Sequence, residues 1–220
     1  CVTGCLNRQT VAQDPGQPFF AYVSFTVPHA GGWGDAPQNP EQGAPVPQDS
    51  PYENQHEWPD VERDHAAVIT YLDSKVGELL STLAELGVEN DTVVFFASDN
   101  GAHLEGGHSE LFFNSTGGLK GHKRSLFEGG VRSPSIVRWP ASPGLKPGTW
   151  SELQWAFWDV LPTVAELIGI PSPAQPFGAT GISLAPTLRG DAPSEQKHHT
   201  HLYFTWDGTG VPPPLKTKQA

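Results

Sequence analysis

Methionine is absent from this 220-residue sequence, cysteine occurs twice, and cations are scarce. Lys and Arg total 13 against 24 Asp and Glu, which gives a formal net charge of -11 at pH 7. Because binding to nucleic acid needs clustered cations, this balance argues against such a partner. No apolar run is long enough to span a membrane, and no signal peptide is visible. Without a methionine there is no native initiator, so we expect a fragment cut at both ends.

The two cysteines, Cys1 and Cys5, leave the redox compartment open. They can form a bridge, but their spacing alone does not establish one. No partner pair of cysteines or histidines stands at the spacing of a zinc site, so the sequence does not indicate structural zinc.

Glycine and proline are abundant, at 24 and 22 residues, and so are aromatic residues, with 7 Trp and 11 Phe. Disordered chains lack aromatic residues, so this composition predicts long structured loops on a folded core. A hydrophobic content of 37% and this length fit one good-sized domain or a piece of a larger one.

Positive charge is concentrated in residues 120–138, where Glu128 is the only acid. The cations are Lys120, Lys123, Arg124, Arg132 and Arg138. A local cluster of cations in an acidic protein indicates a small anionic ligand. An ordinary basic loop is the alternative that charge alone leaves open.

The hydrophobic pattern predicts a helix between two strands. Residues 18–27 and residues 92–97 are apolar runs of strand length, and each is predicted to be a buried strand. Residues 59–86 are predicted to form a helix that starts near Pro59 and is capped by Gly87. Its apolar residues recur at intervals of three and four and predict one buried stripe. The stripe consists of Ile69, Leu72, Val76, Leu79, Leu83 and Leu86.

A strand that reads as a continuous apolar run and follows a helix favours an α/β fold, with a mostly parallel central sheet flanked by helices. The stretch 30–58 is predicted to be a long loop, of the kind that is usually functional. The other expected elements are a strand at 135–139, a helix at 159–168 capped by Asp159, a helix or turn at 182–188, and a weak strand at 201–205.

Asp99-Asn100-Gly101 directly follows the second predicted strand. Ligands of open α/β sheets bind at that end of the strands, and Asp and Asn oxygens suit Ca²⁺ or Mg²⁺. A hairpin turn is the alternative, because Asn-Gly is a strong hairpin signal. A hairpin requires a second strand at once, and residues 102–107 do not supply one.

Lys123 lies in a glycine-punctuated segment that continues to Glu128-Gly129-Gly130. A lysine is a compact charge suited to a tetrahedral anion, and glycines let the backbone approach a ligand closely. His29 follows the first predicted strand and is placed to donate a proton to a leaving oxygen. A solvated lysine and a strand-end histidine with one backbone bond are the alternatives.

His103 and His108 flank Glu105-Gly106-Gly107. They are candidates to line the mouth of a substrate site, and a solvent-facing position is the alternative. The tract formed by His198, His199 and His201 is interpreted as having no role in binding.

Together these pieces resemble the type I, formylglycine-dependent sulfatases, the arylsulfatase-like branch of the alkaline phosphatase superfamily. The similarity covers most of the chain in the family's order. Asp-Asn-Gly combined with Gly-x-Lys and Glu-Gly-Gly-x-Arg-x-Pro is highly specific. The matching segments are PFFAYVSFTVPH (18–29), DHAAVITYLDSKVGELLSTLAELG (64–87), TVVFFASDNG (92–101), GLKGHKRSLFEGGVRSPSIVRWP (118–140) and DVLPTVAELIGI (159–170).

The resemblance implies a role for four of these residues. Asp99 and Asn100 match the family's calcium ligands, and Lys123 matches the lysine that binds the sulfate. His29 matches the histidine that contacts the sulfate and protonates the leaving alcohol. The implied activity is hydrolysis of a sulfuric ester, either an alkyl or aryl sulfate or a sulfated glycan.

The family's nucleophile is a formylglycine made within a Cys/Ser-x-Pro-x-Arg motif, and this sequence has no such motif. We therefore expect residues 1–220 to be the C-terminal part of a sulfatase catalytic domain, with the formylglycine upstream of Cys1. We also expect the chain by itself to be inactive and to hold calcium weakly.

Two other functions stay open. One is a phosphohydrolase of the same superfamily, and the other is a non-enzymatic relative that binds sulfated glycans through Lys120, Lys123 and Arg124. By resemblance the protein is secreted, periplasmic or lysosomal, and the sequence gives no indication of its oligomeric state.

Overall fold

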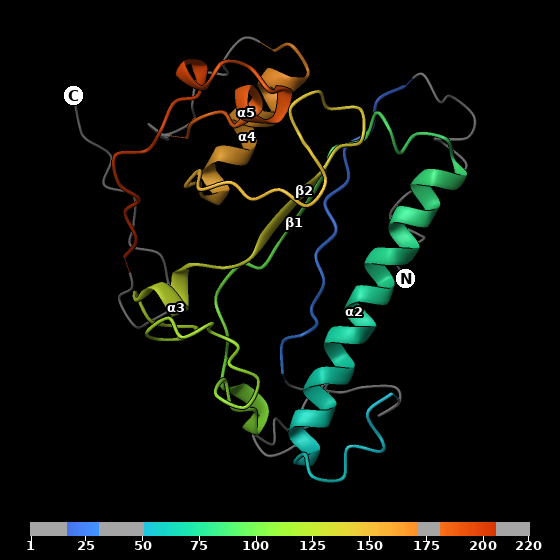
Figure 1. The fold of residues 1–220 in the computed structure, drawn as a ribbon, viewed down its shortest axis with the longest axis vertical. Helices are drawn as coiled ribbons and strands as arrows, with labels where there is room; N and C mark the ends of the chain where they lie inside the picture. The colour runs from blue at the N-terminus through green and yellow to red at the C-terminus, as the bar shows by residue number, and fades with distance from the viewer. Residues whose placement is uncertain (1–16, 31–50, 171–180, 206–220) are drawn as a thin grey trace, which may run out of the picture. The chain divides into compact units, whose positions relative to one another are not determined.

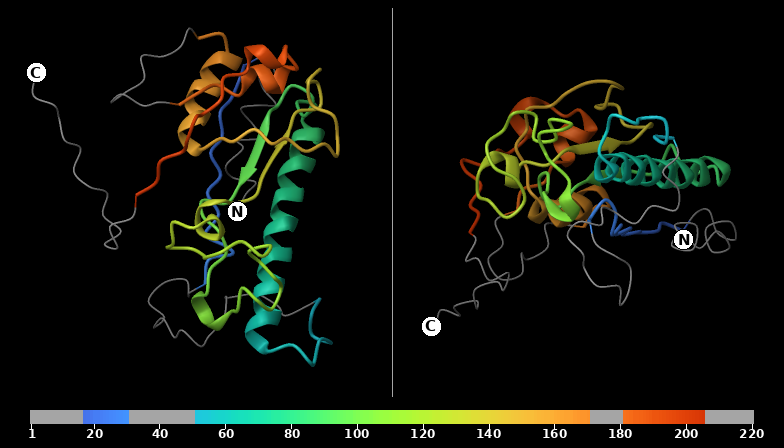
Figure 2. Two further views of the ribbon diagram at one scale, coloured as in Figure 1. Left: turned by 60° about the vertical axis from the view of Figure 1, so that its left-hand side comes forward. Right: turned by 90° about the horizontal axis from the view of Figure 1, so that it is seen from below.

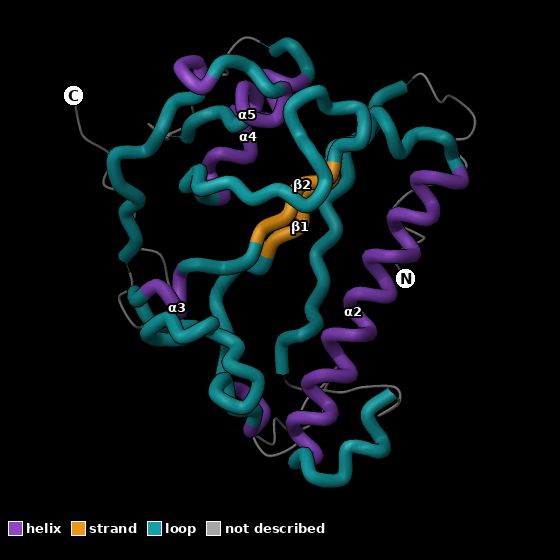
Figure 3. Tube along the Cα trace, in the orientation of Figure 1, coloured by secondary structure: helices purple, strands orange, loops and turns teal. Residues whose placement is uncertain are grey.

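The computed structural model describes residues 17–30, 51–170 and 181–205, which form two compact units. Cys1, Cys5 and most of the predicted loop at 30–58 lie outside these residues. In the described chain the first unit contains residues 17–30, 51–89 and 95–136, and the second contains residues 90–94, 137–170 and 181–205. Loops make up much of both units (Figure 3), as the glycine and proline content predicts.

The first unit is built on one long helix, α2, Asp60–Glu85 (Figure 1), so its predicted bounds are confirmed to within a residue. The helix ends as expected at Gly87, which has a φ of 70°. The Gly87 N–H donates to Ala84 O and the Val88 N–H donates to Leu83 O. This pair of bonds is a Schellman motif, and it satisfies carbonyls that the helix itself leaves unpaired.

The buried face of α2 is narrower and more polar than the apolar stripe predicted for it. Val68 and Leu83 are buried, but Ile69 is 45% exposed, so the prediction was wrong for that residue. The other members of the stripe, Leu72, Val76, Leu79 and Leu86, are half-buried. Glu62 and His65 are buried on the same helix. Because a buried carboxylate needs partners, this face must contact polar groups of another segment.

Two of the four predicted strands form, β1, Val94–Ala97, and β2, Ser135–Arg138. β1 is half-buried along its length rather than fully buried. Residues 18–27 and 201–205 were expected to be strands and are not. A strand needs a neighbouring backbone to complete its hydrogen bonds, and no described segment forms a ladder with either stretch. Residues 18–27 are mostly exposed as a result.

The two strands pair with each other in a two-stranded sheet. The Ser98 N–H donates to Pro134 O at one end, and the Ala141 N–H donates to Asn90 O at the other. Early residues of one strand thus meet late residues of the other, so the pair is antiparallel. An apolar run predicts burial but not strand direction, and parallel pairing does not occur among the described residues.

Two segments of the first unit reach the same end of α2. Residues 17–30 run toward the end at which the helix begins, and the loop after β1 reaches that end too (Figures 1 and 2). This loop contains a 3₁₀ turn, η2, Glu105–Gly107, and leads to the short helix α3, Glu128–Val131. The candidate residues of the first unit are carried by loops and turns rather than by its helices or strands.

The second unit contains α4, Val160–Leu167, and α5, Ala185–Arg189, close to the predicted ranges. Two 3₁₀ turns, η3, Phe157–Asp159, and η5, Pro193–Glu195, accompany them. Gly169, with a φ of 75°, follows the end of α4 as expected.

Asp159 was predicted to cap α4, and it does stand at the N-cap, but its side chain makes no capping bond. Its fully buried carboxylate accepts the backbone N–H groups of Ala156 and Ile182, each at 2.8 Å. His199 Nε2 donates to it at 2.9 Å. His199 therefore contributes to the structure of the second unit by satisfying the buried Asp159 carboxylate.

Candidate anion-binding site

Close packing of glycines joins the loop after β1 to the lysine segment. A Cβ added to Gly101 would lie 1.9 Å from Gly129 O, and one added to Gly129 would lie 2.1 Å from Gly121 O. The Gly101 N–H also donates to Gly130 O at 3.0 Å. Any side chain at these positions would force the backbones apart. Gly101, Gly121 and Gly129 therefore allow close approach of backbone to backbone, and the approach of a ligand to the glycines of the lysine segment remains a prediction.

Lys123 lies beside Glu105, a residue that the sequence did not single out. The Lys123 N–H donates to Ala102 O at 2.6 Å, which fixes its backbone to the loop after β1. Its Nζ donates to Glu105 Oε2 at 3.0 Å, and the two side chains are 16% and 24% exposed. An Arg124 guanidinium nitrogen lies 2.9 Å from Glu105 Oε1. The same carboxylate therefore holds two adjacent cations.

The Glu105 carboxylate is ionised at neutral pH. Burial, the largest single influence, would raise its pKa, but the hydrogen bond and charge of Lys123 and the charges of neighbouring groups together lower the pKa below the ordinary value. His103 and Arg124 act in the same direction. The site thus contains a fixed negative charge among its cations.

His29 approaches the same carboxylate oxygen as Lys123. The His29 Nδ1–H donates to Ala30 O at 2.6 Å, since a carbonyl oxygen can only accept. Its other nitrogen, Nε2, lies 3.9 Å from Glu105 Oε2. The side chain is 52% exposed, so a ligand can reach it. The two residues expected to be catalytic, 94 positions apart in sequence, are brought within reach of one small anionic group.

His103 is buried between these groups. It is 9% exposed, so the solvent-facing alternative does not hold. Its Nδ1 accepts the Glu105 N–H at 3.1 Å, and its ring is stacked on that of His29, with centroids 6.3 Å apart. Burial lowers the pKa of His103, although Glu105 opposes this. His103 is a neutral ring that supports both Glu105 and His29.

His108 is also buried, and it is bound to α2. Its Nδ1–H donates to Glu62 Oε2 at 2.6 Å, and the Ser109 N–H donates to Glu62 Oε1 at 2.8 Å. These are the polar partners that the buried face of α2 requires. His108 therefore fastens the loop to the helix, and a contact between its ring and a substrate remains a prediction.

Aromatic rings enclose this part of the loop. Phe113 is stacked on both His65 and His108 at 6.4 Å, and it makes an edge contact with Trp58 at 5.1 Å. Phe112 packs against Phe113 at 4.8 Å. Rings of this size displace water, which accounts for the burial of the histidines.

Asp99 and Asn100 were expected to bind a metal. Asp99 is exposed, and Asn100 is half-buried, with its amide Nδ2 donating to Gly101 O at 3.0 Å. The hairpin alternative for this turn is wrong, because β1 pairs with β2 far along the chain. Hard oxygen donors fit calcium, but calcium takes six to eight of them. Within the described ranges, no group of three or more His, Cys, Asp or Glu residues is placed to hold a metal.

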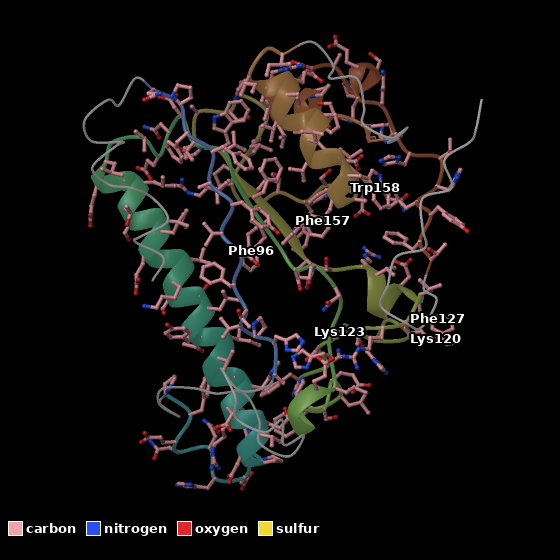
Figure 4. All side chains as sticks on the ribbon, turned by 180° about the vertical axis from the view of Figure 1, so that it is seen from behind. Phe96, Lys120, Lys123, Phe127, Phe157 and Trp158 are labelled. Carbon is pink, nitrogen blue, oxygen red and sulfur yellow. The ribbon has the colours of Figure 1, made fainter. Side chains whose placement is uncertain are left out.

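The cations of the basic segment are largely exposed, but each of those described below contacts a neighbouring side chain. Lys120 Nζ lies over the ring of Phe127 at 4.0 Å, and these two side chains lie together in Figure 4. Arg132 reaches Glu128 at 3.9 Å. Since Lys123 and Arg124 both contact Glu105, each of these four cations has a partner within the first unit. This arrangement gives less support to binding of a glycan through Lys120, Lys123 and Arg124 alone.

Sequence reasoning missed three residues of the cluster, Glu105, Glu62 and His65. Glu105 stood between two histidines that were singled out, and its position beside a lysine loop was the available signal. Glu62 lies in the first turn of α2, where an acidic residue is common for local reasons. Its role depends on a contact 46 residues away, which no local pattern reveals.

Comparison with known proteins places the chain in a family. Residues 6–170 match the family model described as Sulfatase, so the chain belongs to the sulfatase family. Steryl-sulfatase of Mus musculus is 41% identical over 134 residues, which cover 60% of this chain and 21% of that protein. Arylsulfatase A of Bos taurus is 36% identical over 138 residues, which cover 61% and 24%. The chain thus spans less than a quarter of the length of these relatives.

Solved structures agree with the expected fold class. The crystal structure of Ps i-CgsB superimposes with a TM-score of 0.66 at 25% identity, covering 87% of this chain and 38% of that one. The same protein in complex with k-i-k-neocarrahexaose gives a TM-score of 0.63. The α/β fold of the sulfatases is therefore confirmed. No helix in the described part of the chain is both long enough and apolar enough to cross a membrane.

Proposed function

We propose that the protein to which this chain belongs hydrolyses a sulfuric ester, with Lys123 binding the sulfate group and His29 protonating the leaving alcohol. One observation carries the proposal. Lys123 Nζ and His29 Nε2 lie 3.0 Å and 3.9 Å from the same anionic oxygen, Glu105 Oε2. A bound sulfate oxygen near this point would be within reach of both side chains.

Lys123 can serve a ligand while it keeps its contact with Glu105. An ammonium group has three N–H donors, and Glu105 accepts one of them. The remaining donors are available to sulfate oxygens, on which negative charge must be stabilised as the ester bond breaks. The half-buried position of Lys123 strengthens that interaction, because water screens it less.

His29 has the geometry of a general acid. Its Nδ1–H is engaged by Ala30 O, so the proton to be donated is carried on Nε2. Glu105 Oε2 lies on the Nε2 side of the ring, 3.9 Å from that nitrogen. An alcohol is a poor leaving group unless it receives a proton, and a histidine can supply one near neutral pH.

Asp99 and Asn100 supply part of a calcium site in this proposal. Their oxygens have the right chemistry but are too few to complete the coordination of the ion. A calcium ion bound there would contribute electrostatic stabilisation of the sulfate's negative charge. The nucleophile, which the family makes from Cys or Ser, is expected upstream of Cys1.

The substrate is proposed to be a sulfated glycan or a small sulfate ester. Ps i-CgsB, one of the structural neighbours, was solved in complex with k-i-k-neocarrahexaose, and the names of two relatives refer to steryl and aryl sulfates. Those names describe the relatives and not this chain. What the names share is a sulfate ester as the substrate. His103 and His108 are the candidates for contact with the rest of the substrate.

The affinity of the Lys123→Ala variant for phenyl sulfate tests whether Lys123 binds the sulfate group. Titration of phenyl sulfate into the unaltered chain, followed by nuclear magnetic resonance of the histidine rings, should shift the signals of His29. Lys123→Ala should weaken binding at least about tenfold, as expected for the loss of a charge-assisted contact. Lys120→Ala is the matched control, because Lys120 packs on Phe127 instead. Equal affinity of the two variants for phenyl sulfate would show that Lys123 does not bind the sulfate group.

Sequencing the transcript upstream of Cys1 tests the enzymatic half. We expect an in-frame Cys/Ser-x-Pro-x-Arg motif preceded by an Asp-Asp pair. An in-frame Ser or Thr without that motif would overturn the assignment to sulfuric ester hydrolysis in favour of a phosphohydrolase.

A further inference from the structure

Glu105 is an unexpected residue for a site that binds an anion. Its carboxylate lies 3.0 Å from Lys123 Nζ and 2.9 Å from an Arg124 guanidinium nitrogen, so it competes for the cations that an anionic substrate requires. If binding strength alone mattered, a neutral residue would be better at this position. A carboxylate here instead limits the positive charge of the site.

The position of Glu105 is fixed from several sides. Its backbone N–H donates to His103 Nδ1 at 3.1 Å, and Gly106 and Gly107 follow with φ of 77° and 82°. Arg124 also has a positive φ, 73°, which an arginine rarely adopts. Such backbone strain persists only where surrounding contacts maintain it, and the ion pair with Glu105 is one of them.

Charge distinguishes the two ester classes between which the sequence left a choice. A sulfate monoester carries one negative charge at every physiological pH. A phosphate monoester loses a second proton with a pKa of about 6, so it carries nearly two charges above neutral pH. The two esters are similar in shape, and each additional unit of positive charge in the site favours the dianion more than the monoanion.

We propose that Glu105 makes the site selective for singly charged sulfate esters over doubly charged phosphate monoesters, by offsetting one of the two positive charges of Lys123 and Arg124. This inference rests on the proposed function and names the residue that sets its substrate class. Glu105 acts through charge and by positioning Lys123, and it need not touch the reacting atoms. It also explains why His29 and Lys123 are both directed toward a carboxylate oxygen.

The test compares the binding of phenyl sulfate and phenyl phosphate to the unaltered chain and to Glu105→Gln, at about pH 8, where the phosphate ester is a dianion. Glutamine keeps the size of the side chain and removes its charge. The ratio of the two dissociation constants should shift by roughly tenfold toward phenyl phosphate. Glu110→Gln, an equal change in the same loop without a described ion pair, should leave the ratio unaltered.

Arg124→Gln provides a second variant, because it removes a positive charge on the other side of Glu105. In this variant the ratio of the two dissociation constants should shift toward phenyl sulfate. The shift should be smaller than in Glu105→Gln, because Arg124 is 64% exposed and water screens its charge. The two variants thus give opposite signs, which a general loss of structure cannot produce.

The outcomes separate this inference from the proposed function. An unaltered ratio in Glu105→Gln, with a preference for phenyl sulfate in the unaltered chain, would overturn the role of Glu105 and leave the proposed function intact. A preference of the unaltered chain for phenyl phosphate, or no binding of either ester, would overturn both.

Discussion

The imidazole rings of His65 and His108 are stacked, with their centroids 3.6 Å apart and their planes inclined by 17°. Burial lowers the pKa of His65 from 6.5 to about 3, and His108 and His103 act in the same direction. The unfolded chain therefore binds more protons at this residue than the folded chain does. Stability is complete above pH 6.5 and is lost as the pH falls from 6.5 toward 3.

His65→Phe should remove this acid sensitivity. Phenylalanine keeps a ring in the stack and cannot take up a proton. The free energy of unfolding in urea should fall less between pH 7 and about pH 4.5 than in the unaltered chain, by about 2 kcal/mol. His56→Phe, a change at an exposed histidine, is the control, and it should lose as much unfolding free energy on acidification as the unaltered chain does. If His65→Phe lost as much unfolding free energy between pH 7 and about pH 4.5 as the unaltered chain, another titrating group would be the main cause of the acid sensitivity.

Local signals predicted the helices well. The apolar pattern of residues 59–86 predicted α2, and Gly87 predicted where it ends. Both signals are local, because the backbone hydrogen bonds and the caps of a helix involve residues that are close in sequence. The same holds for α4 and Gly169. Asp99, Lys123 and His29 were selected by motif, and the structure carries all three in one compact unit.

Contacts distant in sequence were beyond prediction. The interaction of Glu105 with Lys123 and that of Glu62 with His108 join segments 18 and 46 residues apart. Residues 18–27 have the composition of a strand, but a strand exists only beside a partner, and none of the described segments supplies one. The stripe on α2 failed at Ile69, which is 45% exposed, whereas the polar Glu62 and His65 of the same helix are buried.

Gly129→Ala should distort the lysine segment of the site, within which Gly129 packs on the backbone of Gly121. Its Cβ would lie 2.1 Å from Gly121 O and 2.9 Å from Lys120 O, and both are backbone atoms that cannot move alone. We expect a loss of about 2–3 kcal/mol in the free energy of unfolding, together with weaker binding of phenyl sulfate.

Gly77→Ala is the matched control for this substitution. Gly77 lies within α2, and an added Cβ there meets no atom within 4 Å. Because alanine favours a helix more than glycine does, the control should gain about 0.5–1 kcal/mol. A Gly129→Ala variant as stable as the unaltered chain would show that the lysine segment does not depend on close backbone packing.

Asp159→Asn should destabilise the second unit. Each carboxylate oxygen of Asp159 accepts one backbone N–H, from Ala156 or from Ile182, and His199 donates as well. An amide group would turn one acceptor into a donor that faces another donor. Thermal or chemical unfolding should reveal a loss of about 2–4 kcal/mol. Asp191→Asn, at a surface pair with Arg189, should change stability by less than about 1 kcal/mol.

Calcium binding tests whether Asp99 and Asn100 form part of a metal site. Because no group of three or more His, Cys, Asp or Glu among the described residues is placed to hold a metal, the chain should bind Ca²⁺ weakly, with a dissociation constant above about 0.1 mM. Asp99→Asn should weaken binding further, by about tenfold, since it removes the formal charge of the site. Terbium luminescence or calorimetry measures both, without any need for catalysis. Asp91→Asn, an exposed carboxylate, is the control. Submicromolar affinity in the unaltered chain would show that other residues of this chain complete the site, whereas equal affinity in Asp99→Asn would place the ion elsewhere.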